Sequence, residues 1–553
     1  MKLKDKKLSL SMIIIIILCL IATGIIVSKL VKEVNTGEEL AWFFQESIDT
    51  NQEIVLEDAY VLSADEGLLK FIYDRKNYEV KAVMNENYTG VADIVIDGKM
   101  VSKVRIKPDT IEGTLAQYTE SSLMLEECES MEKKKEVPVY KMIGNRVEQI
   151  EWNELILGTS KIKTVMEAGV VAALLIEEET IPTDIRVLIK NKDSCFYPEI
   201  YIKKVLENTI VDVGTILSNH QRDKVTISDE KGMILCDKNG NALDEVPYEG
   251  VFHIVKTKEG LVLINELPIE TYLKYVLPSE MPKSFETEAL KAQAVCARTY
   301  AYSQMKGGIY AQYGANLDNT TAFQVYHNYG RYPETDAAVD ATKGEVIYCN
   351  DTLITCYYFS TCAGITNDLS VWGDIKADYI TSVGKEITNL DLSKAKEFST
   401  YINTKYEAND AESPYYRWEA VLDISKVHDS SKGKLLSIQV NKRNASGYIT
   451  ELALKYENVT EVITKENDIR QALGVYLAQT TLNNGEVREN LSMVPSACFE
   501  VTSTSKGNIY LKGGGYGHGI GMSQYGANRM AQLGHDYIEI IDYYYNNIVV
   551  QND

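Results

Sequence analysis

The sequence predicts an α+β protein in which a small all-β domain precedes a larger mixed domain. Short runs that alternate apolar and polar residues fill the region from about 52 to 180, as strands do. An alanine-rich stretch typical of a buried helix follows Glu280. Between 181 and 553, strand and helix patterns interleave without the regular alternation that builds a parallel sheet. A chain of 553 residues is also too long for one core, so we expect more than one domain.

The first 30 residues predict a membrane anchor. Four lysines among the first seven residues precede an uncharged apolar run from Leu8 to Val27. About 20 residues can cross a ~30 Å hydrocarbon core as a helix. Positive charge before such a run keeps that end in the cytoplasm. We expect residues 1–30 to form a cytoplasmic tail and a single-pass signal-anchor in the cell membrane, with the remaining chain extracytoplasmic. A cleaved signal peptide is the alternative, although its apolar core would be shorter.

Residues 31–180 predict a β-rich domain without a catalytic constellation. Asp97-Gly98, between two alternating runs, is typical of a hairpin turn. We expect this domain to be an adaptor or spacer that holds residues 181–553 away from the membrane, and a binding role is the alternative.

Composition excludes some classes of function. The formal net charge is −22 and no basic cluster follows the first few residues, which argues against a nucleic-acid partner. The nine cysteines include no CxxC pair, so neither a zinc ribbon nor a thioredoxin-type motif is present. The chain also lacks the HExxH motif of metal-dependent hydrolases.

One carboxyl group stands out in "VLPSEMPKSFETEALKAQAVCARTYAY" (276–302). Glu280 lies between Pro278 and Pro282, and these prolines predict a stiff turn among apolar residues. We expect Ser284 to cap the alanine-rich helix that follows. Apolar surroundings disfavour a charged carboxylate and raise its pKa, so Glu280 can act as a general acid near neutral pH. A turn-capping role or an ion pair is the alternative, and Arg298 is the candidate partner.

Four segments in this order resemble the stage II sporulation protein D family, which includes proteins called amidase enhancers. The resemblance covers roughly residues 185 to 550. The segments are "ELPIETYLKYVLPSEMPKSFETEALKAQAVCARTYAY", "SPYYRWE" (413–419), "NKRNASGYITEL" (441–452) and "IYLKGGGYGHGIGMSQYGANRMAQLG" (509–534).

The resemblance implies that residues 181–553 form a catalytic domain with lytic transglycosylase activity on peptidoglycan. Such enzymes cleave between N-acetylmuramic acid and N-acetylglucosamine and leave a 1,6-anhydro ring. The family's catalytic glutamate matches Glu280, which would act as acid and then as base, whereas a hydrolase usually needs two carboxyl groups. The expected partners are glycan strands and a cell-wall amidase, in sporulation or wall remodelling. The alternative is a non-catalytic, wall-binding activator of such an amidase.

The same comparison suggests substrate contacts. Gln324 and Tyr326 match positions that the family keeps polar and aromatic in its groove. In the glycine-rich segment, His518 could donate to sugar hydroxyls or position the acid, and the segment fits no nucleotide-binding motif. The candidate substrate-binding residues are Arg298, Gln324, Tyr326, Ser360, His518 and Gln524.

Cys356 and Cys362 are the remaining candidate site residues, either as zinc ligands or as a disulfide pair. Some relatives bind zinc in the corresponding stretch through cysteine and histidine, but this chain has no histidine between 328 and 427. We therefore expect no cofactor. A disulfide or buried free thiols are favoured over a zinc site.

Overall fold

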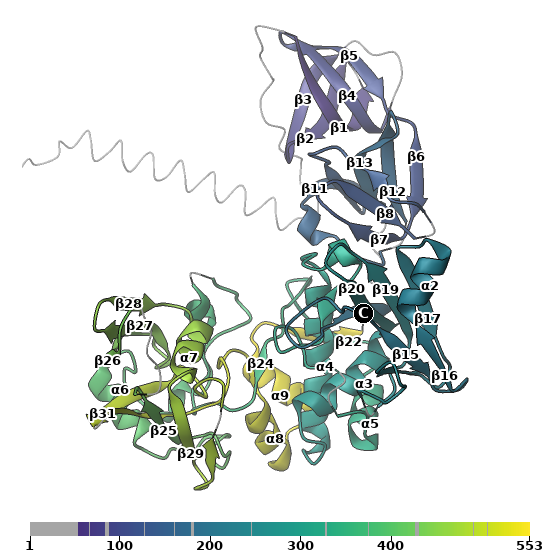
Figure 1. Ribbon diagram of the computed structural model, residues 1–553. Helices are drawn as coiled ribbons and strands as arrows, with labels where there is room; N and C mark the ends of the chain where they lie inside the picture. Colours follow the sequence, from purple (N-terminus) through teal and green to yellow (C-terminus); the bar gives the residue numbers. More distant parts are fainter. Residues whose placement is uncertain are drawn as a thin grey trace, which may run out of the picture. The chain divides into compact units, whose positions relative to one another are not determined.

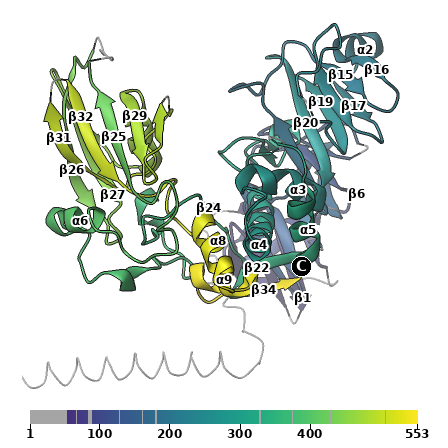
Figure 2. The same ribbon diagram turned by 90° about the horizontal axis from the view of Figure 1, so that it is seen from below.

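The computed structural model shows a mixed α+β architecture (Figures 1 and 2). The predicted anchor at 1–30 lies outside the described residues, and among those that are described no helix is long and apolar enough to cross a membrane. The described residues are 53–552 except for 66, 83–87, 127, 160, 178–181, 245, 327–328, 374, 426–430, 490 and 506.

Two compact units make up the chain. The first takes in the described parts of Met1–Glu112, Met131–Glu151 and Lys161–Glu178. It contains a closed barrel in the order β1-β2-β3-β5-β4 and a five-stranded sheet in the order β11-β10-β13-β12-β6. The strands are β1 (Ile54–Asp65), β2 (Leu68–Tyr73), β3 (Lys76–Ala82), β4 (Gly90–Asp97), β5 (Met100–Ile106), β6 (Thr110–Gly113), β10 (Val139–Ile143), β11 (Arg146–Ile150), β12 (Ile162–Glu167) and β13 (Val170–Ile176).

The predicted hairpin at Asp97-Gly98 is confirmed. It joins β4 to β5, which pair antiparallel, and Gly98 has φ 63° as the tight turn requires.

The second unit takes in the described parts of Gly113–Ser130, Trp152–Ser160 and Glu179–Asp553. A sheet in the order β17-β19-β20-β14-β21 lies at its start, and β20 leads directly into α3. These elements are β14 (Asp184–Ile189), β17 (Lys224–Ser228), β19 (Val251–Lys256), β20 (Leu261–Pro268), β21 (Leu317–Asp318), α3 (Ile269–Glu280), α4 (Thr287–Met305), α5 (Pro333–Ala341) and β22 (Glu345–Cys349).

The alanine-rich helix α4 is central, as predicted. Its alanines at 289, 292, 294, 297 and 301 are completely buried, and it packs against α3, α5, α8 (Gln524–Gln532), α9 (Tyr537–Tyr544) and β22. Small side chains on most faces let these neighbours approach closely.

Two local predictions around Glu280 are wrong. Pro278 does not shape a turn before a helix, because it lies inside α3, whose last residue is Glu280. A proline this close to the helix end removes only one late hydrogen bond, so the helix persists to residue 280. The cap of α4 is Glu286 rather than Ser284, and the Glu286 N–H donates to Asn528 Oδ1 at 2.8 Å. A side chain from α8 thus satisfies a group that Ser284 was expected to satisfy.

The C-terminal part of the unit brings distant segments together. A second sheet, β30-β29-β25-β32-β31, packs on β26-β27-β28 around its own core. The glycine-rich segment connects β32 to β33, and β33 pairs in parallel with β24. Helix α8 follows and ends at Gln532, so Gly534 with φ 95° takes the expected position after the helix. The bounds are β24 (Tyr358–Phe359), β25 (Trp418–Asp423), β26 (Leu435–Arg443), β27 (Ile449–Tyr456), β28 (Thr460–Ile463), β29 (Leu477–Leu482), β30 (Val487–Glu489), β31 (Phe499–Ser505), β32 (Asn508–Gly513) and β33 (Met522–Ser523).

Candidate active site

Glu280 has an unusual environment at the end of α3. Its side chain is partly buried, and one oxygen, Oε1, accepts a hydrogen bond from the Val325 N–H at 3.1 Å. Desolvation raises the pKa of Glu280 to about 7, although hydrogen bonds from Val325 and the Gln524 side chain act in the opposite direction. The rise in pKa expected from the apolar surroundings is therefore found, and the carboxyl group is close to half protonated at neutral pH.

Within the described part of the chain, no cation compensates the charge of ionised Glu280. Among the residues that the structure describes, no lysine, arginine or histidine forms an ion pair with Glu280. Ion pairing would have lowered the pKa and held the group as a carboxylate. The alternative in which Glu280 serves as one half of an ion pair is not supported.

Three tyrosines lie close enough to Glu280 to interact with its charge. Burial raises the pKa of Tyr272, Tyr300 and Tyr358, and the Glu280 charge raises each of them further. All three hydroxyl groups therefore lie within the field of this carboxyl group and stay protonated. Of the three, the Tyr358 hydroxyl accepts a hydrogen bond from Gln324 and keeps its own proton available for donation, whereas the Tyr272 hydroxyl donates to Gln324.

Gln324 arranges two of these tyrosines. Its Oε1 accepts from the Tyr272 hydroxyl at 3.1 Å, while its Nε2 donates to the Tyr358 hydroxyl at 2.9 Å and to the Ala297 carbonyl at 3.1 Å. Gln324 is completely buried. Gln324 therefore positions the Tyr272 and Tyr358 hydroxyl groups and has no exposed atom that could contact a substrate.

Gln524 reaches Glu280 through the pairing of β24 with β33, and Ser360 follows directly after β24. This pairing places Tyr358 opposite Met522 and Phe359 opposite Ser523, so the first turn of α8 lies beside Tyr358. The Ser360 carbonyl accepts from the Tyr525 N–H at 3.0 Å, which secures the start of α8. Gln524, the first residue of that helix, turns its side chain to Glu280.

Arg298 is not a substrate contact, which corrects the prediction. Its guanidinium is completely buried and binds both Glu270 oxygens, at 2.8 and 2.7 Å, as well as the carbonyls of Val339 and Glu345. The position of Arg298 on α4 was compatible with an exposed side chain or with a substrate contact. The Glu270 carboxylate at the start of α3 instead holds the guanidinium inside the fold. Arg298 joins α4 to α3, α5 and β22.

Tyr326 is likewise internal. It is 3% exposed, its hydroxyl donates to Asn265 Oδ1 at 2.7 Å, and its ring stacks on Tyr272 with centroids 5.1 Å apart. A direct sugar contact is therefore excluded for this side chain. Its effect on the site is to hold Tyr272 in place.

His518 lies in an aromatic pocket formed with Tyr357, Phe359 and Trp372. Burial, and to a smaller extent the Arg470 charge, lower the pKa of His518 to about 3, so the ring is neutral at physiological pH. Its Nδ1 accepts from the Ile520 N–H at 3.0 Å. Within the described part of the chain no hydrogen bond joins His518 to Glu280, and the contacts of the ring are those of a structural histidine.

Cys356 and Cys362 do not meet. Cys356 lies beside Cys296 and Tyr545, whereas Cys362 lies near Asp410 and Cys498. All eight cysteines that the structure describes are free thiols, and Cys356 and Cys362 are buried, so of the two favoured alternatives the structure shows the buried free thiols. Among the described residues no three His, Cys, Asp or Glu side chains are grouped so that they could hold a metal ion, and the cysteine pair does not fit a zinc site.

Sequence reasoning missed the three tyrosines. The chain contains 36 tyrosines, and Tyr272, Tyr300 and Tyr358 belong to α3, α4 and β24, so no local pattern distinguishes them. The helix register could have pointed to Tyr272 alone. Tyr272, Val276 and Glu280 are spaced four residues apart in α3, so they lie on the same face of this helix.

Comparisons with known proteins cover this region. A family model described as "Stage II sporulation protein" matches residues 257–348, which include Glu280 and Gln324. A second, described as a domain of unknown function, matches residues 367–480.

Three curated proteins are similar over about half of the chain. An uncharacterized protein of Brachyspira hyodysenteriae is 30% identical over 321 residues, which cover 58% of this chain and 76% of that protein. The amidase enhancer of Bacillus subtilis is 32% identical over 298 residues, 49% of this chain and 39% of that protein. The stage II sporulation protein D of Bacillus subtilis is 29% identical over 296 residues, 51% of this chain and 74% of that protein.

Proposed function

Because the chain belongs to the stage II sporulation protein D and amidase enhancer family, we propose that it is a peptidoglycan lytic transglycosylase of sporulation or wall remodelling. The substrate is the bond between N-acetylmuramic acid and N-acetylglucosamine in wall glycan. The observation that carries the proposal is a partly exposed Glu280 with a pKa of about 7 and no ion-pair partner among the described residues. A group in this state can give a proton and later take one.

The reaction uses one carboxyl group twice. Protonated Glu280 donates its proton to the glycosidic oxygen while the bond from muramyl C1 to that oxygen breaks. The carboxylate then takes the proton of the muramyl 6-hydroxyl as the O6 atom bonds to C1. The products are a glycan end with a free hydroxyl and a 1,6-anhydro end, and water is not consumed.

The neighbours of Glu280 support both steps. Burial favours the neutral acid before the first step, and the Val325 N–H and Gln524 hydrogen bonds stabilise the carboxylate between the steps. The Tyr358 hydroxyl, which accepts from Gln324, keeps its proton and can donate to a sugar hydroxyl or to the carboxylate, whereas the Tyr272 hydroxyl is completely buried and donates to Gln324. A second carboxyl group is not needed in this cycle, because Glu280 itself takes the proton of the muramyl 6-hydroxyl.

The chain is further proposed to act outside the cytoplasm, fixed to the membrane by residues 1–30. The basis is the charge and apolar pattern of these residues. Accessibility of an engineered tag at the C-terminus to protease added to intact cells tests this arrangement.

A second candidate function is activation of a cell-wall amidase. The observation that favours it is the 32% identity to a protein named amidase enhancer. In that case the protein would bind the wall or the amidase without cleaving glycan, and loss of the Glu280 carboxyl would leave its effect intact.

One experiment separates the two functions. Purified protein is incubated with wall glycan strands, with and without prior amidase treatment, and 1,6-anhydro ends are measured by mass spectrometry. We expect the wild type to release them and Glu280→Gln to release none. The control is Glu334→Gln, which changes an exposed glutamate of α5 in the same unit and should release as much as the wild type. Equal release by Glu280→Gln would rule out the transglycosylase mechanism.

A further inference from the structure

Gln293 on α4 is a buried polar side chain without a hydrogen bond. It is completely buried, and neither its Oε1 nor its Nε2 has a hydrogen-bond partner among the residues that the structure describes. Leaving both polar atoms of a buried amide unpaired lowers the stability of a fold, and such atoms are rare in folded proteins. An apolar side chain of similar size, such as methionine, would avoid this loss. A glutamine at this position therefore needs an explanation other than packing.

The register of α4 places Gln293 beside the Glu280 site. Side chains three or four residues apart lie on the same face of a helix, so Gln293, Ala297 and Tyr300 share one face of α4. The Ala297 carbonyl accepts from Gln324 Nε2 at 3.1 Å, and Tyr300 lies within the field of the Glu280 charge. Gln293 therefore lies on the face of α4 that carries the contacts of the site.

Helix α8 runs antiparallel to α4 along this face. At the start of α4 the Glu286 N–H donates to Asn528 Oδ1 at 2.8 Å, and further along α4 Cys296 Sγ lies 4.0 Å from Met522 Sδ, just before α8. As the residue number rises along α4 from 286 to 296, the residue opposite falls from 528 to 522. Interpolation between these two contacts places Gln293 opposite the first residue of α8.

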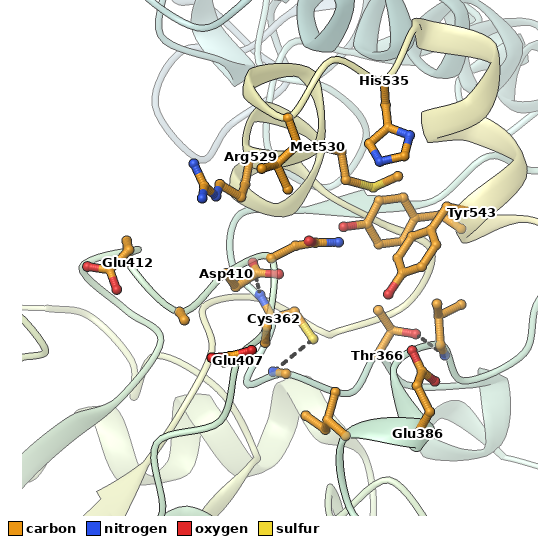
Figure 3. A pocket seen from close by; sticks show the side chains of 18 residues that line it. Cys362, Thr366, Glu386, Glu407, Asp410, Glu412, Arg529, Met530, His535 and Tyr543 are labelled. Atoms are coloured by element: carbon orange, nitrogen blue, oxygen red, sulfur yellow. Dashed lines mark hydrogen bonds between the residues drawn. The ribbon is translucent and has the colours of Figure 1, made fainter.

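That first residue is Gln524, and its side chain also faces α4. Gln524 and Asn528 are four residues apart, so they lie on the same face of α8. Arg529 lies on the other side of the helix, where it lines a separate cavity (Figure 3). Gln524 donates a hydrogen bond to Glu280, and the NH2 group is the donor of a glutamine side chain. The amides of Gln293 and Gln524 therefore face the same region next to Glu280.

A chain of hydrogen bonds can join the two amides to Glu280. A glutamine side chain can present either its NH2 group or its oxygen to a neighbour. Only the NH2 group of Gln524 stabilises the Glu280 carboxylate, because the amide oxygen would repel it. A donor at Gln524 Oε1 fixes the favourable orientation, and Gln293 Nε2 is a donor without an acceptor among the described residues. Charge on Glu280 polarises such a chain and strengthens each hydrogen bond in it.

We propose that Gln293 is a positioning residue for the reaction of Glu280. When Glu280 ionises, Gln293 Nε2 donates to Gln524 Oε1 and keeps the Gln524 NH2 group directed at the carboxylate. This role rests on the proposed function, in which the carboxylate forms between the two steps. An amide that is unpaired before the proton leaves is paired afterwards, so the fold loses stability in one state and the reaction gains in the other.

NMR titration of the Glu280 carboxyl carbon in the purified full chain tests this role without a substrate. The signal is assigned by its loss in Glu280→Gln. Gln293→Met removes the donor and keeps the size of the side chain, so the pKa of Glu280 should rise by about half a pH unit. The titratable groups that face the carboxyl are Tyr272 on α3, Tyr300 on α4 and Tyr358 on β24, and their raised pKa values keep them neutral over this range.

Activity provides the second readout. Gln293→Met should lower kcat about threefold, because the carboxylate between the two steps is less stable. It should leave KM unchanged, because the Gln293 side chain is completely buried and does not touch the substrate. The effect should disappear in a Gln524→Leu background, where the residue through which Gln293 acts is absent. A purely structural role of Gln293 would instead lower activity equally in both backgrounds.

Thr480→Val is the matched control. Thr480 Oγ1 is another completely buried atom without a hydrogen-bond partner among the described residues. It lies on β29, in a sheet that carries none of the residues around Glu280. Thr480→Val and Gln293→Met should both raise the melting temperature, since each removes unpaired polar atoms, but only Gln293→Met should change the titration or kcat.

Gln293→Asn keeps the test decisive if Gln293→Met folds poorly. It retains the amide but is one methylene shorter, so it should move the Glu280 titration in the same direction. Equal titration midpoints in the wild type and in whichever variant folds would overturn the role of Gln293, as would equal losses of kcat in both backgrounds. A wild type that releases no anhydro ends would refute the proposed function, while the titration would still decide on Gln293.

Discussion

A carboxyl group serves as both acid and base only when its pKa is close to the working pH, and Glu280 reaches this state through opposing interactions. Burial acts against the charged form, while the Val325 N–H and the Gln524 amide act for it. Burial without these donors would leave a group that hardly ionises, and the donors without burial would leave an ordinary carboxylate. The balance at about 7 suits a cycle in which the same group gives and takes a proton.

The pH dependence of the reaction follows from this balance. Because the first step needs protonated Glu280, kcat/KM should fall as the pH rises through about 7. Gln524→Leu removes a hydrogen bond that stabilises the carboxylate, so the pKa should increase and the falling limb should move to higher pH. Initial rates of anhydro-end release from pH 5 to pH 9 measure both profiles. A limb that moves to lower pH in Gln524→Leu would contradict the assignment.

The same group should reduce the stability of the folded protein at high pH. Its folded pKa of about 7 exceeds its ordinary value of 4.5, so the folded chain holds a proton that the unfolded chain has lost. The contribution of protonated Glu280 to the free energy of unfolding is fully present below pH 4.5 and is lost as the pH rises through 7. Glu280→Gln should therefore stabilise the protein by up to about 3 kcal/mol near pH 8 and by little near pH 4.

Thermal unfolding of wild type and Glu280→Gln at both pH values measures this difference. Glu334→Gln, an exposed change, should leave the melting temperature unaltered at both. A Glu280→Gln variant that is less stable than the wild type near pH 8 would show that the carboxylate is compensated.

At the scale of elements, the site depends on how α3 and α4 are fixed to each other. Arg298 on α4 binds Glu270 at the start of α3 through two hydrogen bonds, in a completely buried position. Breaking such a pair leaves a carboxylate without its partner. Arg298→Met should therefore reduce the free energy of unfolding by about 3–5 kcal/mol.

Lys291 provides the matched control on the same helix. It pairs with Glu288 at 2.7 Å, but both side chains are partly exposed, at 24% and 31%. Lys291→Met should change the free energy of unfolding by less than about 1 kcal/mol. Denaturant titration of both variants measures the difference, and equal losses would contradict a structural role for the buried pair.

The glycine-rich segment fixes β24 against α8. Gly521 has φ 77°, and a Cβ there would lie 2.0 Å from the Tyr357 carbonyl oxygen, a backbone atom that cannot move alone. Gly534 has φ 95°, but a Cβ there would meet nothing within 4 Å. Gly521→Ala should displace β24, which carries Tyr358 to Glu280, and should abolish activity as well as lower stability.

Gly534→Ala is the control for the backbone strain alone. It should cost about 1–2 kcal/mol of stability and leave the activity per folded molecule unchanged. Anhydro-end release, normalised to the folded fraction from circular dichroism, measures both variants. Full activity in folded Gly521→Ala would show that the position of β24 does not matter for the reaction.

For the whole molecule, the range of each interaction explains what the sequence could predict. The hairpin at Asp97-Gly98, the buried alanine helix and the role of Gly534 follow from rules that act over a few residues. The raised pKa of Glu280 also followed from its immediate neighbours in sequence.

The remaining features depend on residues far apart in the chain. Val325 donates to Glu280 across 45 positions and Asn528 accepts from the Glu286 N–H at the start of α4 across 242, and neither leaves a local pattern. Arg298, the candidate partner of Glu280, pairs instead with Glu270, which lies 28 positions earlier in the chain at the start of α3. The sequence did not predict these contacts, because helix and turn preferences depend only on residues a few positions apart.

The two compact units are not consecutive pieces of sequence, which leads to the last prediction. Gly113–Ser130 and Trp152–Ser160 belong to the unit that holds Glu280. Within it, the Tyr118 ring packs on Trp152 with centroids 5.3 Å apart, and the Gly307 N–H donates to the Asn153 carbonyl at 2.6 Å. Glu126 forms an ion pair with Arg186.

A fragment that begins at residue 182 loses all of these contacts, whereas one that begins at residue 53 keeps them. Leu115, Leu123 and Leu125 are completely buried, and removing three such side chains costs about 5 kcal/mol. The shorter fragment should therefore melt at a clearly lower temperature in differential scanning calorimetry, although it contains the whole Glu280 site. Equal melting temperatures for the Glu280 unit would mean that residues 181–553 fold independently, as a division of the chain at 180 requires.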